Sequence, residues 1–209
     1  LIKTQAEFAA LKSQINPHFL YNTLDNIRTL GYIYNVPEIV QMSSAMANIF
    51  RYSIKGKEFV KVREEIECVQ EYLSIIDIRF AGKFTYDIKI SEELMEEKIL
   101  KMVLQPIVEN AIYHGLEQIL GPGRLTISGE LCGDVIKLVV TDNGKGFEKV
   151  QLEALHRQME SQDSVLTHKT SENRGIGICN IHQRIRLYFG EAYGLKVYSK
   201  PKEGTQVVI

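Results

Sequence analysis

The chain has 209 residues, of which 44% are hydrophobic and 24% are charged, which is enough for one large domain or two modest domains with real cores. Its formal net charge is -1, which argues against nucleic acid or an acidic membrane surface as a partner. The three cysteines, Cys68, Cys132 and Cys179, are far apart and form no C-x-x-C pair, so they indicate neither a disulfide framework nor a zinc site.

A helical hairpin is predicted at the start of the chain. The first helix extends to about Leu30, a break follows in "GYIYNVP", and a second helix runs from about Pro37 to Ile54. Gly31 and Pro37 punctuate the break, and two helices with so short a connection pack antiparallel. The polar, glycine-containing "KGKE" at 55–58 marks a boundary.

The pattern changes from Val60 onward to an alternation of helices and strands. We predict an amphipathic helix over "VREEIECVQEYLSIIDIRF" and, from the period-two alternation, a strand over "KFTYDIKI". One helix is predicted over "EEKILKMVLQPIVENAIYHG", ending at Gly115. A β-hairpin is predicted over "RLTISGEL" and "VIKLVVT", with "CGD" as its turn.

The stretch from about Glu148 to Asn173 has few large apolar residues, which predicts a long functional or mobile loop. A helix ending at Gly190 is then predicted over "RGIGICNIHQRIRLYFG", and two last strands over "LKVYSK" and "GTQVVI". The whole pattern predicts an α+β protein of two domains. Residues 1–57 would form the helical hairpin, and residues 58–209 an α/β unit with helices against a mostly antiparallel sheet.

His18 directly follows Pro17 in "QINPHFLYNTL" and is a candidate for chemistry. On a helical wheel of about 100° per residue, one face is formed by Phe19, Leu20, Leu24, Ile27 and Leu30. The residues within about 40° of His18, on the opposite face, are Asn22, Asp25 and Thr29. We therefore predict an exposed imidazole, which is either a plain polar residue of a wet helix face or a competent nucleophile. Pro17 fits the first turn of a helix capped by Asn16, or a kink in a longer helix.

Three later motifs predict a nucleotide pocket when they are taken in order. Asn110 lies on an apolar helical stripe in "LQPIVENAIYHG", where its carboxamide either bonds a neighbouring backbone group or offers an oxygen ligand to Mg²⁺. Asp142 follows a strand in "TDNGKGF", where a carboxylate could accept a hydrogen bond from an exocyclic amine such as that of adenine. Gly144 and Gly146 would let the backbone approach a flat ring. The glycine pair of "RGIGICNI" opens a helix, which suits phosphates, although it is neither a Walker A loop nor a Rossmann fingerprint.

Together these motifs resemble a known family. "ENAIYHG" resembles the N box, "DNGKGF" the first glycine box and "RGIGICN" the second glycine box of the ATP-binding domain shared by gyrase B, Hsp90, histidine kinases and MutL. "QINPHFLYNTLDNI" is similar to the phosphoacceptor box of the LytS/YesM class of sensor histidine kinases. The resemblance covers the whole chain and implies an α/β two-layer sandwich that binds ATP. It also implies an ATP-dependent protein-histidine kinase, which phosphorylates His18 and passes the phosphoryl group to a response-regulator aspartate.

The resemblance implies roles for single residues. Asn110 would hold Mg²⁺, and Asp142 would bind the adenine amine with help from Thr205 of "EGT". The glycines that would shape the ATP pocket are Gly144, Gly146, Gly175 and Gly177.

Two positions depart from the pattern of many histidine kinases. Phe19 stands where an acidic residue often follows the acceptor histidine, and Tyr113 stands where the N box often has a lysine. We therefore take Asn22 and Asp25 as candidates for orienting His18. The candidates for phosphate contacts in place of the lysine are His114, Lys145 and Arg184.

The resemblance further implies a homodimer, formed through the hairpin as a four-helix bundle, and a partner in the receiver domain of a response regulator. No apolar run approaches the roughly 20 residues that span a bilayer, and no signal peptide is visible. The chain opens at "LIKTQAEF" without an initiator Met and closes within an expected strand. We interpret it as a fragment whose missing upstream part would hold it at the cytoplasmic side of the bacterial membrane.

Two other hypotheses stay open. The first is a degenerate nucleotide-binding signalling dimer without kinase activity, for which Tyr113 is the sequence support. The second is an ATPase clamp of the gyrase or MutL kind, with Glu109 as a candidate carboxylate. The clamp is disfavoured because no transducer domain follows the expected ATP-binding unit.

Overall fold

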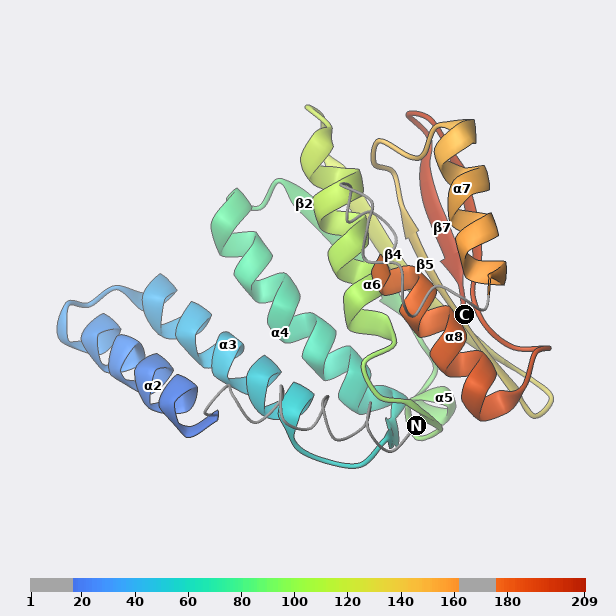
Figure 1. Cartoon of the computed structure of the whole chain (residues 1–209). Helices are drawn as coiled ribbons and strands as arrows, with labels where there is room; N and C mark the ends of the chain where they lie inside the picture. Colours follow the sequence, from blue (N-terminus) through green and yellow to red (C-terminus); the bar gives the residue numbers. More distant parts are fainter. Residues whose placement is uncertain (1–16, 162–175) are drawn as a thin grey trace. The chain divides into compact units, whose positions relative to one another are not determined.

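The computed structural model describes residues 17–161 and 176–209 of the chain (Figure 1). These residues divide into two compact units. One holds the described residues up to Gly56 together with Gln70–Arg79, and the other holds Lys57–Val69 together with Phe80–Ile209. In the described part of the chain, no helix is both long and apolar enough to cross a membrane.

The first unit contains the predicted helical hairpin, formed by α2 (Pro17–Ile33) and α3 (Pro37–Ile54). The prediction that Gly31 breaks the first helix was wrong, because Gly31 is buried inside α2. A Cβ atom at Gly31 would lie 2.9 Å from Val40 Cγ2 and 3.1 Å from Val40 N. The missing side chain therefore lets the two helices approach each other closely.

The second unit is built on a five-stranded sheet with the order β2-β4-β5-β7-β6. Its strands are β2 (Phe84–Lys89), β4 (Gly123–Cys132), β5 (Val135–Asp142), β6 (Lys196–Lys200) and β7 (Gly204–Val208). Only the pair β2–β4 is parallel, and the pairs β4–β5, β5–β7 and β6–β7 are antiparallel. The predicted strands, the β4–β5 hairpin and the mostly antiparallel sheet are all confirmed.

Helices cover one face of this sheet, which makes a two-layer sandwich (Figure 1). They include α6 (Leu104–Asn110), which continues as a π-helix, η1 (Ala111–Gly115), and a short 3-10 turn, η2 (Leu116–Gln118). Beside α6 lies α8 (Ile176–Phe189). The core side of the sheet is apolar and buried through Leu125, Ile127, Leu138, Val140, Val197 and Val207.

The segment predicted as one helix up to Gly115 begins differently. It starts with the short helix α5 (Glu92–Met95) and the strand β3 (Lys98–Leu100), and becomes helical again only at Leu104. The strand β3 pairs antiparallel with β1 (Phe59–Lys61) in a separate two-stranded sheet. Strands this short carry too little periodicity to be recognised, and their pairing depends on a partner far away in the sequence.

The segment from Glu148 onward, predicted as a loop, is partly helical. The helix α7 (Lys149–Glu160) starts with a capping box between Glu148 and Gln151 and buries only Leu155 and Met159. A helix with so few buried residues shows little apolar pattern in the sequence. The rest of the predicted loop, residues 162–175, lies outside the described residues.

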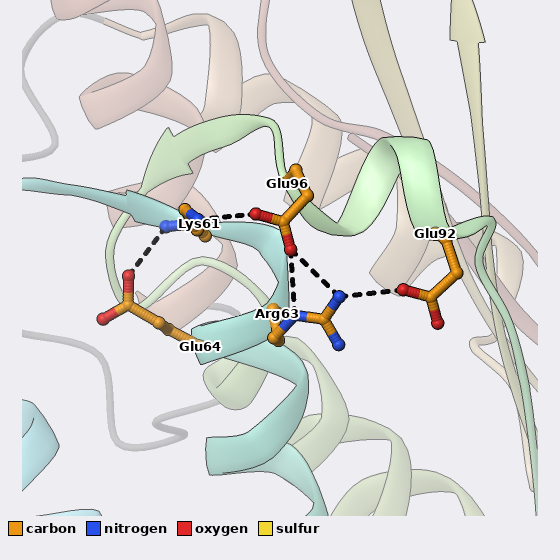
Figure 2. A network of polar contacts seen from close by, with 5 residues as sticks. All are labelled: Lys61, Arg63, Glu64, Glu92 and Glu96. Atoms are coloured by element: carbon orange, nitrogen blue, oxygen red, sulfur yellow. Dashed lines mark hydrogen bonds and ion pairs between the residues drawn. The ribbon is translucent and has the colours of Figure 1, made fainter.

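An exposed network of charges joins the start of α4 (Val62–Phe80) to α5 (Figure 2). Arg63 Nη2 lies 2.8 Å from Glu92 Oε2 and 2.9 Å from Glu96 Oε1. Lys61 Nζ lies 2.5 Å from Glu96 Oε2. A hydrogen bond from Lys61 is the main cause that lowers the pKa of the Glu96 carboxyl, and a hydrogen bond from Arg63 is the next. Because these side chains are exposed to solvent, the network fixes local geometry more than it adds stability.

We expect Gly31→Leu to lower the free energy of unfolding of the hairpin by about 1–3 kcal/mol. The added side chain would collide with Val40, including its backbone nitrogen, and this cost exceeds the roughly 0.8 kcal/mol that leucine gains in helix propensity. Urea unfolding followed by far-UV circular dichroism measures the change. Thr29→Leu, at an exposed position of the same helix, is the matched control. An unchanged stability for Gly31→Leu would contradict the close helix packing.

Candidate functional site

An open pocket of the second unit collects residues from η1 and the strands β5 and β7. Its empty space, including the mouth, is about 580 Å³. The lining residues are Ile107, Asn110, Ala111, His114, Gly115, Val140, Asp142, Gly146, Phe147, Ile178, Thr205 and Val207. Five residues predicted for the site therefore lie together in one pocket: Asn110, His114, Asp142, Gly146 and Thr205.

Asp142 is the buried charged group of this pocket, with 5% of its surface exposed. It is the last residue of β5 and pairs in register with Thr205 of β7. Burial raises the pKa of the Asp142 carboxyl to about 6, although backbone hydrogen bonds from Gly144 and Thr205 act in the opposite direction. The bond from Gly144 N to Asp142 Oδ1 measures 2.8 Å. The carboxylate is therefore held in place and is a strong acceptor for a donor on a bound ligand.

Glycines let three backbone segments meet at Asp142. A Cβ atom at Gly115 would lie 2.7 Å from Asp142 Oδ1, and one at Gly144 would lie 2.3 Å from the carbonyl carbon of Gly115. Gly146 has a φ of 68°, and a Cβ atom there would lie 2.0 Å from the carbonyl oxygen of Lys200. Any side chain would force the neighbouring backbone to shift at Gly144 and Gly146, and would displace the Asp142 carboxylate at Gly115.

Two glycines that pack against Asp142, Gly115 and Gly204, were not predicted as part of the site. Gly115 was interpreted only as a helix end, and Gly204 was not considered, although a Cβ atom at Gly204 would lie 1.9 Å from the carbonyl oxygen of Asp142. The sequence signal was their position next to the predicted site residues, in "YHG" and "EGT". Their importance depends on contacts with a distant strand end, which local patterns do not reveal.

Asn110 is the last residue of α6 and is followed directly by the π-helix. Its Nδ2 donates a hydrogen bond of 2.7 Å to the carbonyl oxygen of Pro106. The amide nitrogen is thus engaged by the backbone of Pro106. The amide oxygen is the atom that could coordinate a cation. Both interpretations of Asn110 are compatible with this geometry. Short π-helical turns inside α-helices are frequent at functional sites.

The remaining predicted pocket residues lie near the lining or outside the described chain. Gly177 is close to Asn110, since a Cβ atom there would lie 3.5 Å from Asn110 Nδ2. Lys145 is exposed, and its backbone N–H donates to the carbonyl oxygen of Gly115 over 3.1 Å. Gly175 lies outside the described residues.

Of the other candidates for phosphate contacts, Arg184 is already engaged. Its Nη2 donates to the carbonyl oxygen of Lys101, in the segment before α6, and it does not line the pocket. Tyr113, at the position where a lysine is common, is 39% exposed and is also absent from the lining. Burial raises the pKa of the Glu109 carboxyl, against a hydrogen bond from Gln105.

His18 lies on α2 in the first unit and is exposed, as predicted. Asn22 Nδ2 lies 3.3 Å from His18 Nδ1, so the structure brings these two predicted residues together. The carboxylate of Asp25 is ion-paired with Arg28 Nη2 at 2.9 Å. Asn16, the predicted cap of this helix, lies outside the described residues, which begin at Pro17.

The pocket fits a nucleotide with a divalent cation better than a metal site made of protein ligands alone. Among the described residues, no group of three or more His, Cys, Asp or Glu side chains could hold a metal ion. Mg²⁺ needs few protein ligands when phosphates and water supply the others. The pocket offers the amide oxygen of Asn110 as one such ligand, and the buried carboxylate of Asp142 lies in the same pocket.

Comparisons with known proteins agree with this geometry. A family model for histidine kinase-, DNA gyrase B- and HSP90-like ATPases matches residues 95–209, and a histidine kinase model matches residues 6–84. The catalytic domain of the histidine kinase ThkA has a similar fold, with a TM-score of 0.50, 14% identity, and coverage of 73% of this chain and 95% of that one.

Curated relatives are similar over nearly the whole chain. Sensor histidine kinase YesM of Bacillus subtilis is 35% identical over 210 residues, which cover 100% of this chain and 34% of YesM. Sensor histidine kinase BtsS of Escherichia coli is 32% identical over 99% of this chain and 33% of BtsS. Sensor protein LytS of Oceanobacillus iheyensis is 33% identical over 95% of this chain and 33% of LytS. The chain thus spans about a third of the length of these relatives.

The buried Asp142 carboxyl predicts a pH-dependent stability. Its folded pKa of about 6 lies above the ordinary 3.8, so ionisation favours the unfolded state. The stability that the protonated group contributes is fully present below about pH 4 and is lost as the pH rises through about 6.

We therefore expect Asp142→Asn to raise the free energy of unfolding at about pH 7 by roughly 3 kcal/mol and to change it little near pH 4. Urea unfolding at the two pH values measures the difference. Asp134→Asn, which removes an exposed carboxylate from the β4–β5 turn, should have no effect at either pH. A loss of stability at neutral pH in Asp142→Asn would contradict the raised pKa.

Proposed function

The chain belongs to the histidine kinase-, DNA gyrase B- and HSP90-like ATPase family, and on this premise we propose that it is the phosphoacceptor and ATP-binding part of a two-component sensor histidine kinase. It transfers the γ-phosphoryl group of ATP to His18, and the group then passes to an aspartate of a response regulator. The observation that carries the proposal is the pocket in which a buried Asp142 and Asn110 lie together, in a chain that also exposes His18 on a helix.

In this proposal one end of the pocket recognises the adenine ring of ATP. The carboxylate of Asp142 accepts a hydrogen bond from the exocyclic amine, and Thr205 beside it in the register contributes to the base site. With a pKa of about 6, Asp142 is mostly ionised at neutral pH and acts as an acceptor. Gly144 and Gly146 keep the backbone close to the ring.

At the phosphate end, the amide oxygen of Asn110 would hold Mg²⁺, which neutralises phosphate charge when it is bound. Of the three candidates for a direct phosphate contact, His114 is the one that lines the pocket. Lys145 and the helix start at Gly177 are further candidates for the phosphates. A missing lysine in the N box would slow the reaction without changing its class, because phosphoryl transfer depends on positioning and charge neutralisation.

His18 acts as the nucleophile. A neutral ring nitrogen donates its lone pair to the γ-phosphorus, the bond from phosphorus to the bridging oxygen breaks, and ADP leaves. Asn22 orients the ring, because its amide Nδ2 lies within hydrogen-bond distance of His18 Nδ1, at 3.3 Å. Asp25 is a weaker candidate for this role, since its carboxylate is paired with Arg28.

The hairpin is proposed to dimerise into a four-helix bundle. On α2, the apolar side chains Phe19, Ile27 and Leu30 are 67%, 41% and 51% exposed, respectively. Burying such side chains against a second copy would remove apolar area from water. The partner for phosphoryl transfer is a receiver domain, and the longer protein would place this part at the cytoplasmic side of a bacterial membrane.

The test is incubation of the whole chain with Mg²⁺ and γ-labelled ATP, beside His18→Ala. We expect label that is acid-labile and base-stable, and that is lost in His18→Ala. Label that survives in His18→Ala would mean that another residue is the acceptor. ATP binding without any label would favour the degenerate signalling dimer, and steady release of phosphate without label would favour the ATPase clamp.

Gly115→Ala should weaken ATP binding by at least about tenfold, because its Cβ atom would lie 2.7 Å from Asp142 Oδ1 and displace the carboxylate. Isothermal titration calorimetry measures the affinity. Gly121→Ala is the matched control, because a Cβ atom there meets no other atom within 4 Å. Equal affinities for both variants would contradict the role of Asp142 at the base.

A further inference from the structure

Glu65 of α4 is fully buried, with 0% of its surface exposed, and lies outside the pocket. Its carboxylate accepts three backbone hydrogen bonds from the segment that starts α6. Oε1 accepts from Met102 N at 2.6 Å, and Oε2 accepts from Val103 N and Leu104 N at 2.9 Å each. A buried carboxylate is stable only when donors surround it, and here all three donors come from one short stretch of backbone.

The same stretch is held from a second side. The carbonyl oxygen of Lys101 accepts a hydrogen bond from Arg184 of α8, and Lys101 N donates to the carbonyl oxygen of Glu58 over 2.8 Å. Met102 has a φ of 59°, a left-handed conformation that is strained for a residue other than glycine. Such a conformation persists only where its surroundings impose it, and Glu65 binds its N–H directly.

The held stretch leads straight into the nucleotide pocket. Asn110 ends the helix that begins at Leu104, and the π-helix continues to Gly115. At that far end, the carbonyl oxygen of Gly115 accepts from Lys145 N at 3.1 Å. The helical rod is therefore attached at both ends, and its continuous backbone hydrogen bonds couple the position of Asn110 to the position of the helix start.

We infer that Glu65 is a positioning residue for the cation and phosphate side of the ATP site. It fixes the start of α6, and thereby where the Asn110 amide lies, while the bond from Lys145 N to the carbonyl oxygen of Gly115 anchors the far end of the same helix beside Asp142. Arg184 supports the same stretch from α8. This inference rests on the proposed ATP-binding function, since it assigns a role toward the ligand of that pocket.

A purely structural role makes a different prediction from a positioning role. If Glu65 only stabilises the fold, its replacement lowers stability but leaves the affinity of the folded protein unchanged. If Glu65 positions Asn110, its replacement weakens binding of ATP with Mg²⁺ more than binding of ATP without Mg²⁺. The Mg²⁺-dependent part of the affinity is therefore the decisive readout.

The test compares the whole chain with Glu65→Gln and Glu65→Asp, using calorimetric titrations of ATP with Mg²⁺ and with a chelator, and urea unfolding without nucleotide. Glu65→Gln turns one acceptor oxygen into a donor that faces a backbone N–H, and Glu65→Asp withdraws the carboxylate by one carbon. Glu67→Gln is the control, because Glu67 is an exposed glutamate of the same helix.

We expect Glu65→Gln to weaken Mg²⁺-ATP binding by about tenfold, the scale seen for residues that support a metal ligand. Binding of ATP without Mg²⁺ should change by less than about twofold, and Glu67→Gln should match the wild type. Glu65→Asp should change binding in the same direction as Glu65→Gln.

Unchanged Mg²⁺-ATP affinity in folded Glu65→Gln, or an equal loss with and without Mg²⁺, would overturn the inference. If Glu65→Gln does not fold, Glu65→Asp decides by the same criterion, and failure of both to fold would make Glu65 a folding residue and also overturn it. A wild-type chain that does not bind ATP would instead refute the proposed function itself.

Discussion

The burial of one carboxylate, Asp142, is the constraint on which the rest of the pocket depends. A carboxylate at a strand end that is 5% exposed loses hydration, and burial raises its pKa to about 6. At neutral pH such a group lowers stability, so the fold must supply donors close to it. The nearest donors are the backbone N–H groups of Gly144 and Thr205, and the close approach of Gly115, Gly144 and Gly204 is possible because these residues have no side chain. The acid and the glycines around it therefore form one physical unit.

This requirement explains why residues far apart in the sequence are joined at one end of the sheet. Gly115 is where the α6–η1 helix ends, and its carbonyl oxygen accepts from Lys145 N. The carbonyl oxygen of Lys145 in turn accepts from Lys202 N at 2.7 Å, which ties in the β6–β7 turn. Main-chain bonds of this kind are insensitive to side-chain identity. The end of the helix, the loop after β5 and the β6–β7 turn are therefore joined by main-chain hydrogen bonds beside the pocket.

Much of the architecture was predictable from the sequence, because the elements with strong periodicity are also those that bury one face. The strands of the five-stranded sheet and helices such as α3, α4 and α8 follow this rule. The prediction failed where stability comes from distant contacts: the paired strands β1 and β3, the weakly buried α7, and the π-helix after Asn110. The same division holds for the site. Asp142 and Asn110 stand in recognisable motifs, whereas Gly115, Gly204 and Glu65 matter through backbone groups that only the folded chain brings near.

The two candidate centres need opposite environments, and this explains their separation in the sequence. A phosphoacceptor must be reached by a phosphorylated ligand and later by a partner protein, so an exposed imidazole such as His18, with Asn22 beside it, is suitable. An acceptor for a base must be shielded from water, since a hydrogen bond gains strength and selectivity when the competing solvent is removed. One rigid pocket could not provide both conditions for the two residues. With the histidine on a separate helix, the imidazole can stay exposed while Asp142 stays buried.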